Sequence, residues 1–145
     1  MLTHFQYWLY SKTILMTDQS ENDIDWRILI DLFILGEARG IPDLQNAAID
    51  GLIDKQATEE NTPLEQISHI YDNMTDDSPL RQLYVGFTHT EAGPDGWFSA
   101  EQYETCTKRF YFDLSVALCQ TTFGLNKKVV NFKTVRSDYY VPVSD

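Results

Sequence analysis

The loop formed by residues 91–102 (EAGPDGWFSAEQ) contains the residues that come closest to a metal-binding arrangement. A calcium-binding loop of this length needs a glycine at its sixth position and a glutamate at its twelfth, whose carboxylate binds the ion through both oxygens. If Gly96 takes the glycine position, Glu91 falls at the first position. Gly93 then occupies the third position and Gln102 the twelfth, so the essential carboxylate is missing. We therefore predict no calcium site and interpret the loop as a turn that leads into a helix cap.

Other residues that often carry catalysis or bind metals are scattered through the chain. The three histidines, His4, His69 and His89, lie in different segments, and none has a His or Cys partner at the spacing of zinc ligands. The chain contains no GxSxG, HExxH or CxxC motif and no phosphate-binding glycine loop. Glu101 and Glu104 are expected to share a solvated helix face. We therefore predict no catalytic, cofactor-binding or metal-ligating residues, and a protein that is not an enzyme.

The charge of the chain argues against binding to nucleic acid. Its 145 residues include 11 Lys and Arg against 22 Asp and Glu, which gives a net charge of −11. Between Asp18 and Asp77 there are fifteen acidic residues and three basic ones. A surface of this kind repels phosphate backbones, so we expect protein partners rather than DNA or RNA. The basic stretch from Lys127 to Arg136 is expected to be a solvated end.

The apolar segments and the two cysteines favour a location in the cytoplasm or nucleus. The longest apolar run, near Ile28, is interrupted by Asp31, whereas a membrane span needs about 18 uninterrupted residues. The N-terminus has no basic start and no small-residue cleavage site, so we predict no signal peptide. Cys106 and Cys119 are expected on one helix, ~20 Å apart and too far for a disulfide. Free thiols are typical of reducing compartments.

The stretch from Ile24 to Ile53 is predicted to form two packed helices around which the rest of the chain is organised. Its first half is apolar almost all round, which is typical of a buried helix, and Asp23 is a plausible N-cap for it. Gly40 suits a left-handed helix end, and Pro42 suits the first turn of the next helix. The sequence therefore predicts a helical hairpin with a tight corner.

Three further helices are predicted downstream of this hairpin. One starts at Thr62-Pro63, with Thr62 as its cap, and a second starts at Ser78-Pro79. A long helix is predicted from a capping box at Ser99 through about Phe123. With a short aromatic helix over residues 2–10, the pattern predicts an all-α domain of about five helices over residues 1–124, divided into 1–55 and 62–124. Residues 125–145 are interpreted as a flexible C-terminal tail, with one short extended piece near residues 129–132.

Several sequence motifs occur along the chain in a specific order. They are Trp8-Leu9-Tyr10, residues 28–35, Ile41-Pro42-Asp43-Leu44, residues 46–50, 70–73, 78–83, 112–118 and 138–141. In this order they resemble the C-terminal half of a BTB/POZ domain, in which a helix ending in Trp/Ile-Tyr and a variable link precede an apolar helix, a Leu/Ile-Pro-type corner and a small-residue helix. The chain is most similar to fungal BTB-containing proteins, in which the later helices and the Tyr-Tyr-Val ending also recur.

This resemblance implies a non-enzymatic adaptor that binds proteins through helical surfaces. We expect Phe5, Tyr7 and Trp8 to face a partner, because so much apolar surface at one end needs a cover. The strands and the dimer-forming helix of the BTB front half are not matched, so homodimerisation is not expected of this segment by itself. Two alternatives stay open: a truncated remnant that folds only with that front half, or a ubiquitin-ligase substrate adaptor if a full BTB domain lies upstream.

Overall fold

The computed structural model describes residues 5, 6, 8, 24–59, 62–91, 106–122 and 136–143. In these residues the chain forms five α-helices and no strand, which confirms the predicted all-α class. The elements are α2 (Trp26–Arg39), α3 (Pro42–Glu59), α4 (Ile67–Asn73), α5 (Pro79–Glu91), α7 (Lys108–Thr122) and the short 3₁₀ segments η2 (Leu64–Gln66) and η4 (Arg136–Tyr139).

The predicted hairpin of α2 and α3 is confirmed, together with the residues that make its corner. Gly40 has a φ of 66°, and its N–H donates to the carbonyl of Glu37, while the next N–H donates to Gly36. This pattern satisfies the last carbonyls of α2 and stops the helix. Gly36 also lets the two helices approach closely, because a Cβ there would lie 2.8 Å from the Cγ of Gln45.

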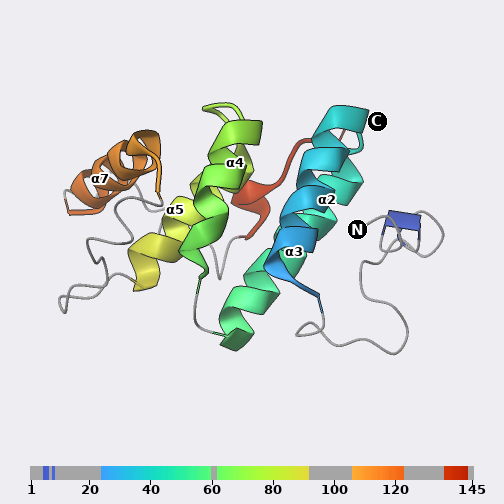
Figure 1. Ribbon diagram of the computed structural model, residues 1–145, viewed down its shortest axis with the longest axis horizontal. Helices are drawn as coiled ribbons and strands as arrows, with labels where there is room; N and C mark the ends of the chain where they lie inside the picture. The colour runs from blue at the N-terminus through green and yellow to red at the C-terminus, as the bar shows by residue number, and fades with distance from the viewer. Residues whose placement is uncertain are drawn as a thin grey trace.

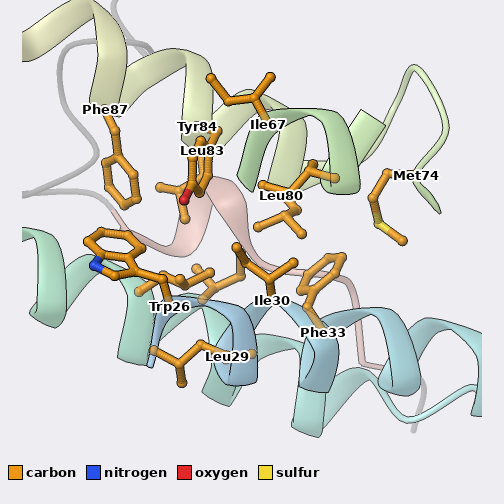
Figure 2. Close-up of a cluster of buried hydrophobic side chains, with 14 of the residues drawn as sticks. Trp26, Leu29, Ile30, Phe33, Ile67, Met74, Leu80, Leu83, Tyr84 and Phe87 are labelled. Atoms are coloured by element: carbon orange, nitrogen blue, oxygen red, sulfur yellow. The ribbon is translucent and has the colours of Figure 1, made fainter. Parts of the chain in front are cut away.

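One face of this hairpin packs against a second layer made by α4 and α5 (Figure 1). Trp26, Ile30 and Phe33 of α2 point toward Leu80 and Leu83 in the close-up of the core (Figure 2). Trp26 meets the rings of Tyr84 and Phe87 edge to face, with centroids 6.2 and 6.1 Å apart. These aromatic contacts add to the burial of apolar surface that stabilises the two-layer core.

Helix α7 forms a third layer, against α5 and α4 on the side away from the hairpin (Figure 1). The prediction of one helix from Ser99 is wrong where it can be tested, because Cys106 and Thr107 are not helical and α7 begins at Lys108. The Thr107 hydroxyl accepts a hydrogen bond from the N–H of Phe110 at 3.2 Å. Thr107 therefore acts as the N-cap, and the predicted box at Ser99 lies outside the described residues.

Two other helix starts also differ from the prediction. Asp25 precedes α2 in an extended conformation, whereas Asp23 lies outside the described residues. Pro63 is extended (ψ 118°) and precedes the 3₁₀ segment η2, so Thr62 does not cap an α-helix directly. The start of α5 follows the prediction: Pro79 is its first residue, and the Ser78 hydroxyl accepts from the N–H of Leu80 at 3.2 Å.

The prediction of a loose C-terminal tail is wrong for residues 136–143. Tyr139 is 1% exposed and belongs to the core, and its segment η4 lies between α3 of the hairpin and α5 (Figure 1). The side chain of Asn46 binds both backbone groups of Val141, accepting from its N–H at 2.6 Å and donating to its carbonyl at 2.9 Å. The hydroxyl of Tyr140 donates to Asp50. This segment is therefore part of the folded domain, while the predicted extended piece near residues 129–132 lies outside the described residues.

Candidate functional site

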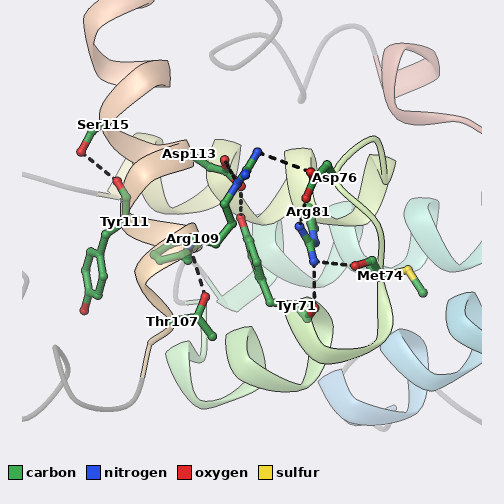
Figure 3. A network of polar contacts seen from close by, with 10 residues as sticks. Tyr71, Met74, Asp76, Arg81, Thr107, Arg109, Tyr111, Asp113 and Ser115 are labelled. Carbon is green, nitrogen blue, oxygen red and sulfur yellow. Dashed lines mark hydrogen bonds and ion pairs between the residues drawn. The ribbon is translucent and has the colours of Figure 1, made fainter.

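A polar network joins α4, the turn after it, α5 and α7 on one side of the molecule (Figure 3). At its centre is Arg81, whose side chain is 10% exposed. One terminal nitrogen of Arg81 donates to the carbonyls of Tyr71 and Met74, at 2.8 and 2.5 Å. The other donates to Asp76 at 2.9 Å, and the guanidinium lies 4.2 Å from the centre of the Tyr71 ring. A buried cation of this kind needs such a set of partners to offset its lost hydration.

The network continues from Tyr71 to α7. The Tyr71 hydroxyl donates to one oxygen of Asp113 at 2.7 Å, and the Nε of Arg109 donates to the other at 3.1 Å. Burial, followed by the hydrogen bond to Asp113, raises the pKa of Tyr71 above its usual range. A terminal nitrogen of Arg109 also lies 3.8 Å from Asp76, so Arg81 and Arg109 approach the same carboxylate from two sides.

The outward side of α7 carries an apolar row over about two turns. Phe112, Val116 and Cys119 are exposed, and they are spaced four and three residues apart. In an α-helix this spacing places them within a sector of about 60°, opposite to the buried residues of the same helix. Phe112 is 58% exposed, and the guanidinium carbon of Arg109 lies 5.3 Å from the centre of its ring. We call these three residues the α7 stripe; the buried face opposite consists of Phe110, Leu114 and Ala117.

The α7 stripe was not singled out from the sequence, although its spacing could have been noticed. The residues that were expected to face a partner lie elsewhere. Trp8 is 3% exposed and belongs to the core, and Phe5 is half-buried and packs against it. Tyr7 lies outside the described residues. Trp8 therefore contributes to the domain's own core in this structure rather than to an exposed surface.

Among the described residues, no group of three or more His, Cys, Asp or Glu side chains is placed to hold a metal ion. His69 lies in α4, with its Nε2 2.7 Å from a carboxylate oxygen of Asp31 in α2, and is partly exposed as expected. His89 lies in α5, where burial lowers its pKa. His4 and residues 92–102 are outside the described residues.

The two cysteines are both free thiols. Cys106 is buried and precedes α7, whereas Cys119 is exposed on its surface. They do not share the helix on which their separation was estimated, because α7 begins after Cys106.

None of the helices in the described ranges combines the length and the hydrophobicity needed to cross a membrane.

Comparisons with known proteins found no matching family model, no similar curated protein and no similar solved structure. The resemblance to BTB/POZ domains therefore remains a hypothesis that depends on the sequence motifs alone.

Proposed function

We propose that this chain is a non-enzymatic protein-interaction module that presents the α7 stripe to a segment of a partner protein. The observation that supports the proposal most is the exposure of Phe112 beside Val116 and Cys119, opposite the buried face of the same helix. An apolar row on a helix that already packs through its other side is typical of a docking surface. Arg109, whose guanidinium lies against the Phe112 ring, is of a residue type that is enriched among interface hot spots.

Charge complementarity favours an acidic partner segment. Lys108 and Arg109 are exposed at the start of α7, on the side of the stripe. The sequence from Cys106 to Arg136 holds six basic residues and one acidic residue, whereas the rest of the chain holds five basic and twenty-one acidic ones. A partner segment that combines apolar side chains with acidic ones is therefore attracted to Lys108 and Arg109 beside the stripe, whereas the net charge of −11 of the chain opposes its binding elsewhere.

Site-specific photo-crosslinking followed by measured affinity tests this function. A photoreactive phenylalanine analogue replaces Phe112 in one chain and the solvent-exposed Ala38 of α2 in a control chain. Both chains are then incubated with an extract of the source cells. The protein that is crosslinked only at position 112 is then purified, and its dissociation constant is measured by calorimetry. We expect Phe112→Asp to weaken binding at least about tenfold without changing the melting temperature. Equal affinity for the parent and Phe112→Asp would contradict the proposal.

A further inference from the structure

The turn between α4 and α5 places an exposed carboxylate against two arginines. Asp76 is 66% exposed and lies 2.9 Å from a terminal nitrogen of Arg81 and 3.8 Å from one of Arg109. The first distance is a charge-assisted hydrogen bond, whereas the second is beyond hydrogen-bond length. Asp76 therefore satisfies one arginine and only approaches the other.

The two arginines are held in place by groups other than Asp76. Arg81 is anchored by the carbonyls of Tyr71 and Met74, and Arg109 is anchored by Asp113. The Nε of Arg81 is buried and has no hydrogen-bond partner among the described residues. Both guanidinium groups would consequently keep their positions if the Asp76 side chain turned away, and one buried N–H of Arg81 still lacks an acceptor.

This arrangement is continuous with the α7 stripe. Arg109 reaches Asp76 with its guanidinium and covers the ring of Phe112 with the same group. An anionic group bound between the two arginines would therefore lie beside the Phe112 ring of the stripe. Arginine is a preferred residue for recognising carboxylate and phosphate groups, because its planar donors match two oxygens at once, and clusters of arginines bind phosphorylated or acidic motifs.

We propose that Arg81 and Arg109 form an oxyanion site in which Asp76 stands in for an anionic side chain of the partner segment. On binding, the partner's carboxylate or phosphate replaces the Asp76 carboxylate between the arginines, and the Asp76 side chain rotates away toward the solvent. The proposal rests on the proposed function for the identity of the partner. The site itself is defined by Arg81, Arg109 and Asp76.

Titration with inorganic phosphate at constant ionic strength tests the site without any partner. The Nε–H groups of Arg81 and Arg109 are followed in ¹⁵N–¹H spectra of Asp76→Ala and of the matched control Asp77→Ala. The two variants have the same net charge and change neighbouring exposed positions of one turn. We expect phosphate to shift both arginine signals in Asp76→Ala and to bind it at least about tenfold more tightly than Asp77→Ala.

Sodium acetate in place of phosphate distinguishes the two sources of the anion. Equal affinities for acetate and phosphate assign the site to a carboxylate. An affinity for phosphate at least about tenfold higher than for acetate assigns it to a phosphorylated side chain. If Asp76→Ala fails to fold, the pair Asp76→Asn and Asp77→Asn replaces it, because asparagine keeps the shape of the turn residue. Equal phosphate binding by the two members of a folded pair, or no shift of either arginine signal, would overturn the site. Such a result leaves the Phe112 crosslinking test unaffected, so the two proposals fail separately.

Discussion

Tyr71 is the residue whose ionisation links the polar network to the stability of the domain. Burial and the hydrogen bond to Asp113 raise its pKa, and burial and then Asp138 raise that of Tyr139. In the unfolded chain both phenols lose their protons near the ordinary tyrosine pKa of 10.0. The folded state therefore binds more protons than the unfolded state above about pH 10, and the free energy of unfolding falls as the pH rises through this range.

Replacing Tyr71 by Phe separates the contribution of Tyr71 to the alkaline loss of stability from that of Tyr139. At neutral pH we expect Tyr71→Phe to lower the free energy of unfolding by about 1 kcal/mol, because the hydrogen bond to Asp113 is lost. Between about pH 9 and 11 the variant should lose stability less steeply than the parent, because one of the two raised groups is gone. Urea unfolding at several pH values measures both effects. Curves that run parallel for the two proteins would show that Tyr71 does not carry the alkaline sensitivity.

The sequence places Tyr71 on one apolar helix face with Ile67 and Ile70, and the structure buries all three. The sequence did not predict that the Tyr71 hydroxyl meets Asp113, because helical periodicity indicates which side of a helix faces the core but not which polar atoms meet. The same limit applies to the oxyanion site. Arg81 and Arg109 are distant in sequence, and only the packing of α7 beside the turn after α4 brings them together.

At the scale of the elements, the hairpin of α2 and α3 depends on two close approaches that differ in kind. A Cβ at Gly36 would meet the Gln45 Cγ at 2.8 Å and backbone atoms at 3.2 and 3.3 Å, whereas a Cβ at Gly51 would meet only the end of the Leu29 side chain, at 2.9 Å. A side-chain end can move, but the backbone of a packed helix cannot do so cheaply.

This difference predicts that the same Gly→Ala substitution costs more stability at position 36 than at position 51. Gly36→Ala should lower the free energy of unfolding by about 1–3 kcal/mol, because the helices must separate. Gly51→Ala should cost less or be neutral, because alanine favours the helix by about 0.5–1 kcal/mol and offsets the shift of Leu29. Chemical denaturation of both variants checks the order. A more stable Gly36→Ala than Gly51→Ala would mean that the hairpin is packed differently.

The C-terminal segment gives a second prediction at this scale. Asn46→Ala removes both hydrogen bonds to the backbone of Val141, so we expect a loss of about 1–2 kcal/mol and faster amide exchange at residues 139–141. Val143→Ala, at an exposed position of the same segment, should stay within about 0.5 kcal/mol of the parent. Equal melting temperatures for the two variants would show that the segment is not fixed by Asn46.

Elements with strong local signals were predicted well, and elements fixed by distant contacts were not. Gly40 and the Ser78-Pro79 pair act through their own backbone neighbours, and both took the predicted roles. The segment around Tyr139 has no helical periodicity, and its order comes from Asn46 and Asp50, about ninety residues earlier. Composition alone therefore indicated a tail where the chain in fact returns to the core.

At the scale of the whole molecule, the three layers determine which surface is available to a partner. The hairpin and α7 lie on opposite sides of α4 and α5 (Figure 1), so among the described elements α7 has a neighbouring layer on one side. The sequence predicted the helices but not this order of layers, since the faces of α4 and α5 are apolar enough to pack in more than one way. The exposure of the α7 stripe is a consequence of that order.

The central claim of this account is that α7 packs through one face and presents the other, and two thermal melts test it directly. Far-UV circular dichroism is followed for Phe110→Asp and Phe112→Asp, which place the same charge on opposite sides of one helix. Phe110 is fully buried, so Phe110→Asp should lose the sharp transition of the parent, at a cost of more than about 3 kcal/mol. Phe112→Asp should melt within about a degree of the parent. Equal losses in the two variants, or a greater loss for Phe112→Asp, would contradict the claim.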